Sequence, residues 1–408
     1  MRTYSAPASS RRSKEFVRDL LAGGGVRTTL AIILGFAVGS AFMVFSDEDV
    51  QVTLGYFFSR PSDFFVAAGS VLQVASEAIF RGAIFNQNAD TVALGLKSLT
   101  ETLRFGAPLI AAGLGIALGF RVGLFNIGGT GQLVFGAAIS GWVSFKLPLP
   151  GGIHLVVAII AGILAAALWG AIAGFLKART GAHEVILTIM LNYIGINLVT
   201  WMLRDPAILQ DPTVGAAPRS LPPLETAQMP LLLGSDYALH AGFILVVAAT
   251  VLYWWLMERS VLGFKLRMVG YNPHAARTAG INIDNVYFLT MALSAGFVGI
   301  AAVNQSLGRD SGFTSGVHSG IGFDAITVAL LGAGTPWGVF FAGLLFGAFK
   351  AAAPAMQVAG IAPEVLGIVQ GAIVLFIAAP PLIRAIFRLP KERASRARPI
   401  TTKAEEAP

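Results

Sequence analysis

The sequence contains no cysteine among its 408 residues. Disulfide bridges, thiolate metal ligands and redox-active thiols are therefore excluded. Charged side chains are also scarce, at 12% of the chain, which is about half of their usual share in soluble proteins. The five histidines are scattered, and none of them forms a group with the spacing of metal ligands. The composition thus gives no support to a metal centre or to thiol chemistry.

Motifs for nucleotide hydrolysis and for zinc peptidases are absent as well. The chain has neither a GxxxxGK[ST] phosphate-binding loop nor an HExxH pair. A membrane enzyme usually gathers histidines or carboxylates near one face, and this sequence shows no such concentration. We therefore expect that the chain is not an enzyme and that it needs no cofactor.

Long apolar runs fill most of the chain. Hydrophobic residues make up 55% of it, and its 47 glycines suit helices that pack closely in lipid. Ten runs can be compared with the roughly 20 residues that a helix needs to cross a bilayer. They lie at about 30–45, 91–120, 124–145, 153–176, 182–203, 237–257, 283–304, 321–334, 337–357 and 364–387. We predict an all-α, polytopic membrane helix bundle of about ten transmembrane helices in one domain, 30–387.

Three segments depart from this regular pattern. The acidic, aromatic segment 46–90 is too interrupted to span by itself, so we expect interfacial helix and loop there. Three glycines within 128–131 disfavour a regular helix and predict a break near 124–135. A short apolar run followed by a proline predicts a broken or re-entrant pair of helices over 321–336.

The distribution of Lys and Arg predicts the orientation of the chain. The basic stretch 1–29 is either part of a signal peptide or the segment before an uncleaved first helix, and the long apolar run that follows favours the helix. A cytoplasmic N-terminus places 20 of the 29 basic residues on the inner side. We therefore expect both termini in the cytoplasm, with 388–408 as a tail, 258–282 as a cytoplasmic loop and 204–236 as an external loop. The net charge of +7 reflects this topology, and we expect no nucleic acid partner.

The loop 258–282 contains the stretch GYNPHAARTAGI, which carries the signals of a short capped helix. Asn272 is a favoured N-cap, Pro273 fits the first helical position, and Gly280 suits the residue after the helix. A rigid helix with small side chains suits insertion into a groove on another protein, while an ordinary turn between membrane helices is the alternative. The residues that we assign to such a docking segment are Arg267, Gly270, Asn272, Pro273, Ala275, Ala276, Arg277 and Gly280.

Four stretches resemble, in order and spacing, the permeases of the bacterial ABC importer group for simple sugars, nucleosides and branched-chain amino acids. They are FRVGLFNIGGTGQLVFGAA (120–138), GAHEVILTIMLNYI (181–194), GFKLRMVGYNPHAARTAGI (263–281) and GFDAITVALLGAGTPWGVFFAGLLFGAF (322–349). The HEV stretch in particular resembles the nucleoside-importing branch. One departure is Thr130, because the group usually has an acidic residue before the second glycine of its FNIG segment.

This resemblance implies a permease subunit in the bacterial cytoplasmic membrane, surrounded by lipid, that imports nucleosides. It implies that 272–280 is the coupling helix of a separate cytoplasmic ATP-binding cassette ATPase. A second homologous permease and an extracytoplasmic substrate-binding lipoprotein are the other expected partners. A permease for ribose-type sugars or branched-chain amino acids, and an ion-coupled secondary transporter, are the alternatives.

Polar side chains at membrane depth are costly, so we treat them as candidates for the substrate path. Glu184, Thr188 and Asn192 share one helix face at i, i+4 spacing. Their alternative role is hydrogen bonding between helices, or an ion pair of Glu184 with Arg179. For the other candidates the alternatives are helix packing, helix capping or a place at the membrane interface. The full set is Asn126, Gln132, Glu184, Thr188, Asn192, Asn304 and Asp324.

Overall fold

The computed structural model describes residues 24–215, 217–379 and 386–387, and helices dominate this part of the chain. Eight helices within it are long and apolar enough to cross a membrane, which confirms the predicted all-α polytopic bundle. They correspond to α2 (Gly24–Ser46), α4 (Pro61–Ala83), α6 (Lys97–Arg121), α8 (Ile153–Thr180), α9 (Glu184–Met202), α10 (Gly242–Arg259), α13 (Ile283–Leu307) and α15 (Pro336–Val358). The predicted basic N-terminal stretch up to residue 23 and the predicted tail 388–408 lie outside the described residues.

The remaining helices are shorter or less apolar. They are α3 (Glu48–Leu54), α5 (Val92–Gly95), α7 (Gly129–Lys146), α11 (Val261–Tyr271), α12 (Pro273–Thr278), α14 (Ile321–Leu331), α16 (Glu364–Ala378) and the 3₁₀ turns η1 (Pro212–Val214), η2 (Glu225–Ala227) and η3 (Ser315–His318). Of these, α7, α14 and α16 fall on predicted apolar runs.

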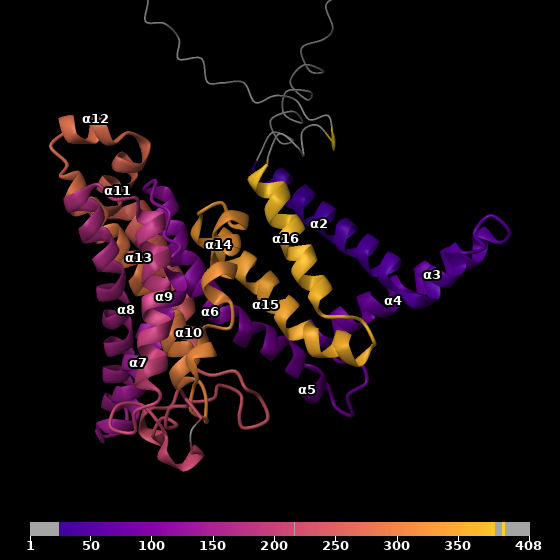
Figure 1. Cartoon of the computed structure of the whole chain (residues 1–408), viewed down its shortest axis with the longest axis horizontal. Helices are drawn as coiled ribbons and strands as arrows, with labels where there is room; N and C mark the ends of the chain where they lie inside the picture. The colour runs from indigo at the N-terminus through magenta and orange to yellow at the C-terminus, as the bar shows by residue number, and fades with distance from the viewer. Residues whose placement is uncertain (1–23, 216, 380–385, 388–408) are drawn as a thin grey trace, which may run out of the picture.

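The expectation for 46–90 was wrong in one respect. Although Asp63, Glu77 and Arg81 lie within it, α4 is a continuous helix of 23 residues. Because its charged residues are few and well separated, α4 remains apolar enough to span. Figure 1 shows α3 and α4 extending obliquely away from the rest of the bundle.

Helices α6 and α13 form the centre of the bundle. Within α6, every residue from Gly106 to Gly119 is buried, and most of α13 is buried too. Their close approach depends on Gly115, where a Cβ atom would collide with the main-chain oxygen of Ser294. Packing through small residues is the usual way in which membrane helices associate, since lipid gives no hydrophobic driving force between them.

Both predicted helix breaks are present. Residues 122–128 between α6 and α7 are not helical, and α7 begins at Gly129, so the break occupies the first part of the predicted segment 124–135. Helix α14 has 11 residues and ends at Leu331, with Gly332 as its C-cap. The chain then turns through Ala333 and Gly334, both with positive φ, before α15 begins.

The two predicted loops lie at opposite ends of the bundle. Figure 1 shows α11 and α12 at one end and the irregular segment that follows α9 at the other. The start of α2 and the end of α16 lie toward the same end as α12. The segments that we expect on the cytoplasmic side therefore lie at one end of the bundle, and the expected external loop lies at the other end.

Candidate functional site

Asn126 and Gln132 belong to a buried polar cluster at the start of α7. The Asn126 Nδ2 donates to Gln132 Oε1 at 3.1 Å and to Ser294 Oγ on α13 at 2.8 Å. The Asn126 Oδ1 accepts from Gln132 Nε2 at 3.0 Å and from the main-chain N–H of Gly128 at 2.9 Å. These bonds hold the non-helical connection of 122–128 against two helices, as buried polar groups require.

Asn192 joins α9 to the same connection. Its Oδ1 accepts from the Gly131 N–H at 2.7 Å, and its Nδ2 donates to the Ile127 carbonyl at 2.8 Å. On the same face, Thr188 donates to the Glu184 carbonyl at 2.8 Å. The side-chain oxygen and nitrogen of Asn192 are thus used within the chain.

Glu184 forms an ion pair, but with a different residue from the one considered in the sequence. Its Oε2 lies 2.6 Å from Lys177 Nζ near the end of α8, and its Oε1 accepts from the Phe125 N–H at 3.4 Å. Arg179 instead lies over the ring of Phe175. The contacts of Glu184, Thr188 and the asparagines are those of helix packing, and their place in the substrate path stays a prediction.

A second polar region, which we call the outer cavity, lies toward the other end of α13. It has a volume of about 220 Å³. Its walls come from α6, α13, α15, the start of α14 and the segment before α10. The lining residues are Arg104, Phe105, Pro108, His240, Asn304, Gln305, Gly308, Arg309, Ser319, Ile321, Lys350 and Ala353.

Three cations line the outer cavity. Lys350 Nζ lies 2.8 Å from Asp324 Oδ2, and Arg104 pairs with Glu101 at 2.6 Å. Arg309 donates to Gln305 Oε1 at 3.1 Å and pairs with no carboxylate in the described part of the chain. Burial lowers the pKa of Arg309, and the nearby Arg104 charge lowers it further. The outer cavity is therefore rich in hydrogen-bond donors and carries excess positive charge.

Two neutral polar groups complete this lining. Asn304 is 3% exposed and donates from Nδ2 to the Ile300 carbonyl, while its Oδ1 has no partner among the described residues. His240 accepts from the Gly242 N–H at 3.2 Å, and burial lowers its pKa to about 4. The His240 ring is therefore neutral at pH 7, so Asn304 and His240 add polarity to the outer cavity without charge.

One wall of the outer cavity, at Lys350 of α15, reaches membrane depth, whereas His240 and Arg309 lie just outside the ends of the spanning helices α10 and α13. Lys350 stands 14 positions after Pro336, the first residue of α15, which corresponds to roughly 21 Å at 1.5 Å per residue. Helix α14 begins at this depth, since Lys350 also donates to the carbonyl of Ser319 just before it. Transporters commonly bind their substrate where a discontinuous helix begins near mid-membrane. Asn304 lines this cavity and Asp324 pairs with its Lys350, whereas Asn126, Gln132 and the α9 residues lie apart from it.

The docking segment forms the capped helix that the sequence predicts. The Asn272 Oδ1 accepts from the N–H groups of His274 and Ala275 at 3.0 and 3.1 Å, and Gly280 has φ +80° after the end of α12. Arg277 and Ala275 are exposed, but Ala276 is fully buried in the chain's own core. The face that α12 offers to a partner therefore excludes Ala276.

Helix α11 attaches this segment to the bundle. Gly270 lies against the main chain of Arg121 at the end of α6, where a Cβ atom has no room. The Arg121 side chain pairs with Glu258 at 2.6 Å, and Arg267 approaches the same carboxylate at 3.9 Å. We call these four residues the Arg121 junction.

The Arg121 junction also meets the turn between α14 and α15. Gly334 lies against the Arg121 side chain, and its carbonyl accepts from the Tyr253 hydroxyl at 3.0 Å. Four charged residues of these two regions were not among the site residues predicted from the sequence: Arg104, Arg121, Glu258 and Lys350. Charged residues within or beside long apolar runs are the signal that could have found them.

Within the described residues, no group of three His, Asp or Glu side chains is arranged to hold a metal ion.

Residues 98–378 match the family described as the branched-chain amino acid transport system permease component. The chain is 35% identical over 370 residues to the guanosine ABC transporter permease protein NupP of Bacillus subtilis (strain 168), which covers 90% of this chain and 96% of that relative.

Two further relatives show comparable similarity. The nucleoside ABC transporter permease protein NupB of Lactococcus lactis subsp. cremoris (strain MG1363) is 36% identical over 76% of this chain and 86% of its own length. The glucose ABC transporter permease protein TsgB13 of Haloferax volcanii is 33% identical over 68% of this chain and 75% of its own length. No solved structure matches the chain.

Proposed function

The chain belongs to the permease component family of branched-chain amino acid transport systems, and on this premise we propose that it forms the membrane path of an ATP-driven nucleoside importer. The observation that carries the proposal is the match to NupP over almost the whole length of both chains. NupB, whose name also states nucleosides, supports the same substrate class. Sugar import is the second candidate function, because the name of TsgB13 states glucose.

We place α11 and α12 in the cytoplasm and α12 in a groove of a separate ATPase. The excess of Lys and Arg in this loop and toward both termini supports that orientation. The exposed side chains of Ala275 and Arg277 offer a small, basic docking face. The Arg121 junction then connects a movement of α12 to α6 and to the turn between α14 and α15.

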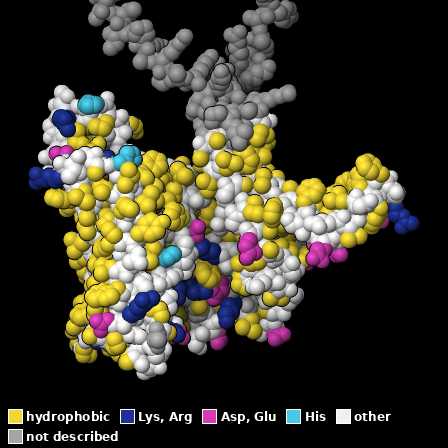
Figure 2. Space-filling model, viewed as in Figure 1, with side chains coloured by type: hydrophobic (Ala, Val, Ile, Leu, Met, Phe, Trp, Pro, Cys, Tyr) yellow, Lys and Arg dark blue, Asp and Glu magenta, His cyan; other side chains and the backbone are white. Residues whose placement is uncertain are grey.

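A second permease subunit faces the outer cavity in this proposal. The side chains of Lys350 and Asp324 are 28% and 25% exposed although they lie at membrane depth. Figure 2 shows charged side chains of both signs close together in the middle of the view, with hydrophobic side chains predominating to the left of them and above. Lipid tails cannot solvate such groups, so a water-filled path or another protein must cover them.

The segment 204–236 is the proposed contact for an extracytoplasmic binding protein. Its backbone is held in place by an antiparallel bridge between Gln210 and Ser220 and by the hydrogen bond from the Ser220 N–H to the Phe313 carbonyl. The Asp211 side chain accepts from the N–H and hydroxyl groups of Thr213, and these bonds lower its pKa. An ordered loop costs less entropy on docking than a flexible one.

The substrate class is tested by uptake of labelled adenosine, uridine, ribose and leucine in cells with and without the gene. We expect gene-dependent uptake of at least one nucleoside, and weaker uptake of ribose and leucine. Gene-dependent uptake of ribose alone would favour the sugar alternative. Gene-dependent uptake of leucine alone would contradict both candidate functions while leaving the family membership intact.

A further inference from the structure

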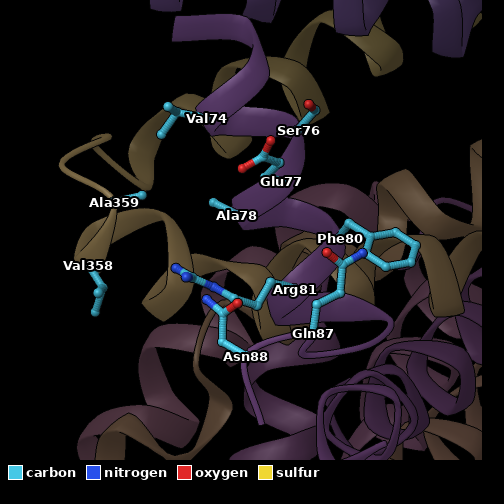
Figure 3. Close-up of a pocket in the computed structure, with 10 residues that line it drawn as sticks. All are labelled: Val74, Ser76, Glu77, Ala78, Phe80, Arg81, Gln87, Asn88, Val358 and Ala359. Carbon is cyan, nitrogen blue, oxygen red and sulfur yellow. The ribbon is translucent and has the colours of Figure 1, made fainter. Parts of the chain in front are cut away.

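A large cavity lies between α4 and the end of α15, away from the outer cavity. It has a volume of about 550 Å³ and is lined by polar residues of α4 and of the following loop, together with Val74, Phe80 and Val358. Figure 3 shows the side chains of Glu77 and Arg81 projecting from α4 into this space, with Asn88 next to Arg81. We call it the α4 cavity.

The two charged residues of the α4 cavity do not pair with each other. Glu77 and Arg81 stand at i and i+4 on one helix face, which is the spacing at which opposite charges usually pair. Glu77 instead accepts from Gln73 Nε2 at 2.8 Å, and the Arg81 side chain forms no hydrogen bond or ion pair with any of the described residues. The α4 cavity therefore holds an anion and a cation whose charges are both available to a ligand.

The α4 cavity lies where two membrane helices reach the same side of the bilayer. Helix α4 ends at Ala83 and α15 ends at Val358, and both are long and apolar enough to span. The polar loop 84–91 follows α4 directly. Helix α4 is oblique in Figure 1, so the turns that carry Glu77 and Arg81 differ less in membrane depth than they would in an upright helix. Lipid headgroups occupy this level of a membrane.

We propose that the α4 cavity binds the headgroup of a phospholipid that carries both a phosphate and a primary ammonium group. The guanidinium of Arg81 and the amide of Asn88 bind the phosphate oxygens, as charged and amide donors do for phosphate. The Glu77 carboxylate accepts from the ammonium. Val74, Phe80 and Val358 contact the acyl chains. This inference depends on the membrane location of the chain and not on its substrate.

The donor and acceptor pattern selects among the common phospholipids. A phosphoglycerol headgroup has no cation to balance Glu77, and a phosphocholine headgroup has a cation without an N–H donor. A phosphoethanolamine headgroup supplies the anion, the cation and the N–H donors together. The α4 cavity should therefore prefer phosphatidylethanolamine to phosphatidylcholine and phosphatidylglycerol.

The first test measures which lipid the assembled transporter retains. The complex is reconstituted in nanodiscs of equal phosphatidylethanolamine, phosphatidylcholine and phosphatidylglycerol, extracted into detergent and analysed by native mass spectrometry. We expect about two- to fivefold more retained phosphatidylethanolamine than either other lipid, the effect of a partly exposed ion pair. Equal retention of the three lipids would overturn the proposal without touching the transport function.

Charge variants separate the two halves of the headgroup. Arg81→Gln should lower the retention of all three lipids, while Glu77→Gln should remove only the preference for phosphatidylethanolamine. Arg60→Gln and Asp63→Asn make the same charge changes at the opposite end of α4, outside the α4 cavity, and should change nothing. The same loss in these control variants would contradict the assignment.

A thiol probe gives a readout that needs no loss-of-charge variant. The chain has no cysteine, so Ser76→Cys, at an exposed lining position that the proposal does not use as a ligand, places a single thiol in the α4 cavity. Its labelling by a membrane-impermeant maleimide should be slower in phosphatidylethanolamine nanodiscs than in phosphatidylcholine nanodiscs. Equal rates would contradict the proposal. A thiol that is protected in every lipid and cross-links to the second permease would also overturn it, because protein would then cover the α4 cavity.

Discussion

Asp324 and Lys350 form the ion pair that best tests the role of the outer cavity. We expect Asp324→Asn or Lys350→Gln to leave one uncompensated charge at membrane depth, at a cost of about 1–3 kcal/mol, between the values for exposed and buried pairs. Uptake should fall in each single variant. The double variant should recover part of the loss, since no unpaired charge remains.

The control for this cycle is Lys97→Gln, which removes a charge at the first residue of α6. Initial uptake rates are measured at equal amounts of inserted protein. If the double variant is as defective as the sum of the single variants, the two residues do not act as a pair. In that case Asp324 has its own role, either as a substrate contact or in the first turn of α14.

Asn192 tests whether the inner polar cluster packs helices or contacts substrate. Asn192→Ala leaves the Gly131 N–H and the Ile127 carbonyl unpaired, which should cost about 1–3 kcal/mol of stability. We expect a lower thermal midpoint of unfolding in detergent and an unchanged KM for uptake by the folded fraction. Asn197→Ala, at an exposed position of the same helix, is the matched control. A raised KM at unchanged stability would instead place Asn192 in the substrate path.

His240 gives the bundle a predictable dependence on pH. Its pKa in the folded chain is about 4, below the ordinary value of 6.5, so the unfolded chain binds the extra proton between these values. Stability is therefore lost as pH falls from 6.5 toward 4, by about 2 kcal/mol between pH 7.5 and pH 5. His240→Asn should abolish this part of the change in thermal midpoint. An equal change in wild type and variant would refute the assignment.

At the scale of the elements, α11 attaches α12, the proposed coupling helix, to the bundle. Gly270→Val would place side-chain atoms where Arg121 lies, and such overpacking costs about 1–3 kcal/mol. We expect the variant to insert in the membrane and hydrolyse ATP in the complex, with nucleoside uptake reduced more than ATP hydrolysis. Gly69→Val on α4, where no atom lies within 4 Å of the added Cβ, should keep both activities. An equal loss of the two activities in Gly270→Val would show general destabilisation.

Elements that depend on local chemistry could be predicted from the sequence. Asn272 and Gly280 define the two ends of α12. The Asn272 side chain accepts hydrogen bonds from the first N–H groups of the helix, and Gly280 takes the positive φ that ends it, so both signals lie within a few residues of the helix. The short helix α14 followed from the short apolar run and the proline after it, which are also local signals. The continuity of α4 was missed because the charged residues within it were read as interruptions of the apolar run. The signals that end a helix lie in neighbouring residues, whereas the continuity of an apolar helix with a few charged residues depends on the surroundings of those residues in the fold.

The outer cavity depends on contacts that no local pattern contains. Arg104, Arg309 and Lys350 are separated by long stretches of sequence, and only the packing of α6, α13 and α15 brings them together. Asn304 was a candidate, but the arginines near it were counted only for topology. Likewise the partner of Glu184 proved to be Lys177, because the turn between α8 and α9 determines which cation reaches it. Sequence spacing gave the polar positions, and tertiary packing determined their partners.

At the scale of the whole molecule, the chain has a capped helix at one end of the bundle and a polar cavity toward the other. The Arg121 junction lies between α11, α6 and the turn that begins α15, while α15 carries Lys350 into the outer cavity. A continuous set of packed elements therefore joins the predicted ATPase contact to the predicted substrate path. Such contiguity is required for mechanical coupling, but only a measured coupling demonstrates it.

The measurement that tests the central claim most directly is the uptake of a labelled nucleoside into right-side-out membrane vesicles. The vesicles carry the complete transporter and are loaded with an ATP-regenerating system, and the binding protein is present on their outer side. Wild type is compared with Arg277→Glu, which reverses a charge on the exposed face of α12. We predict ATP-dependent uptake that resists a protonophore and falls strongly in Arg277→Glu. Uptake that persists without ATP and collapses with the proton gradient would contradict the account and favour an ion-coupled transporter.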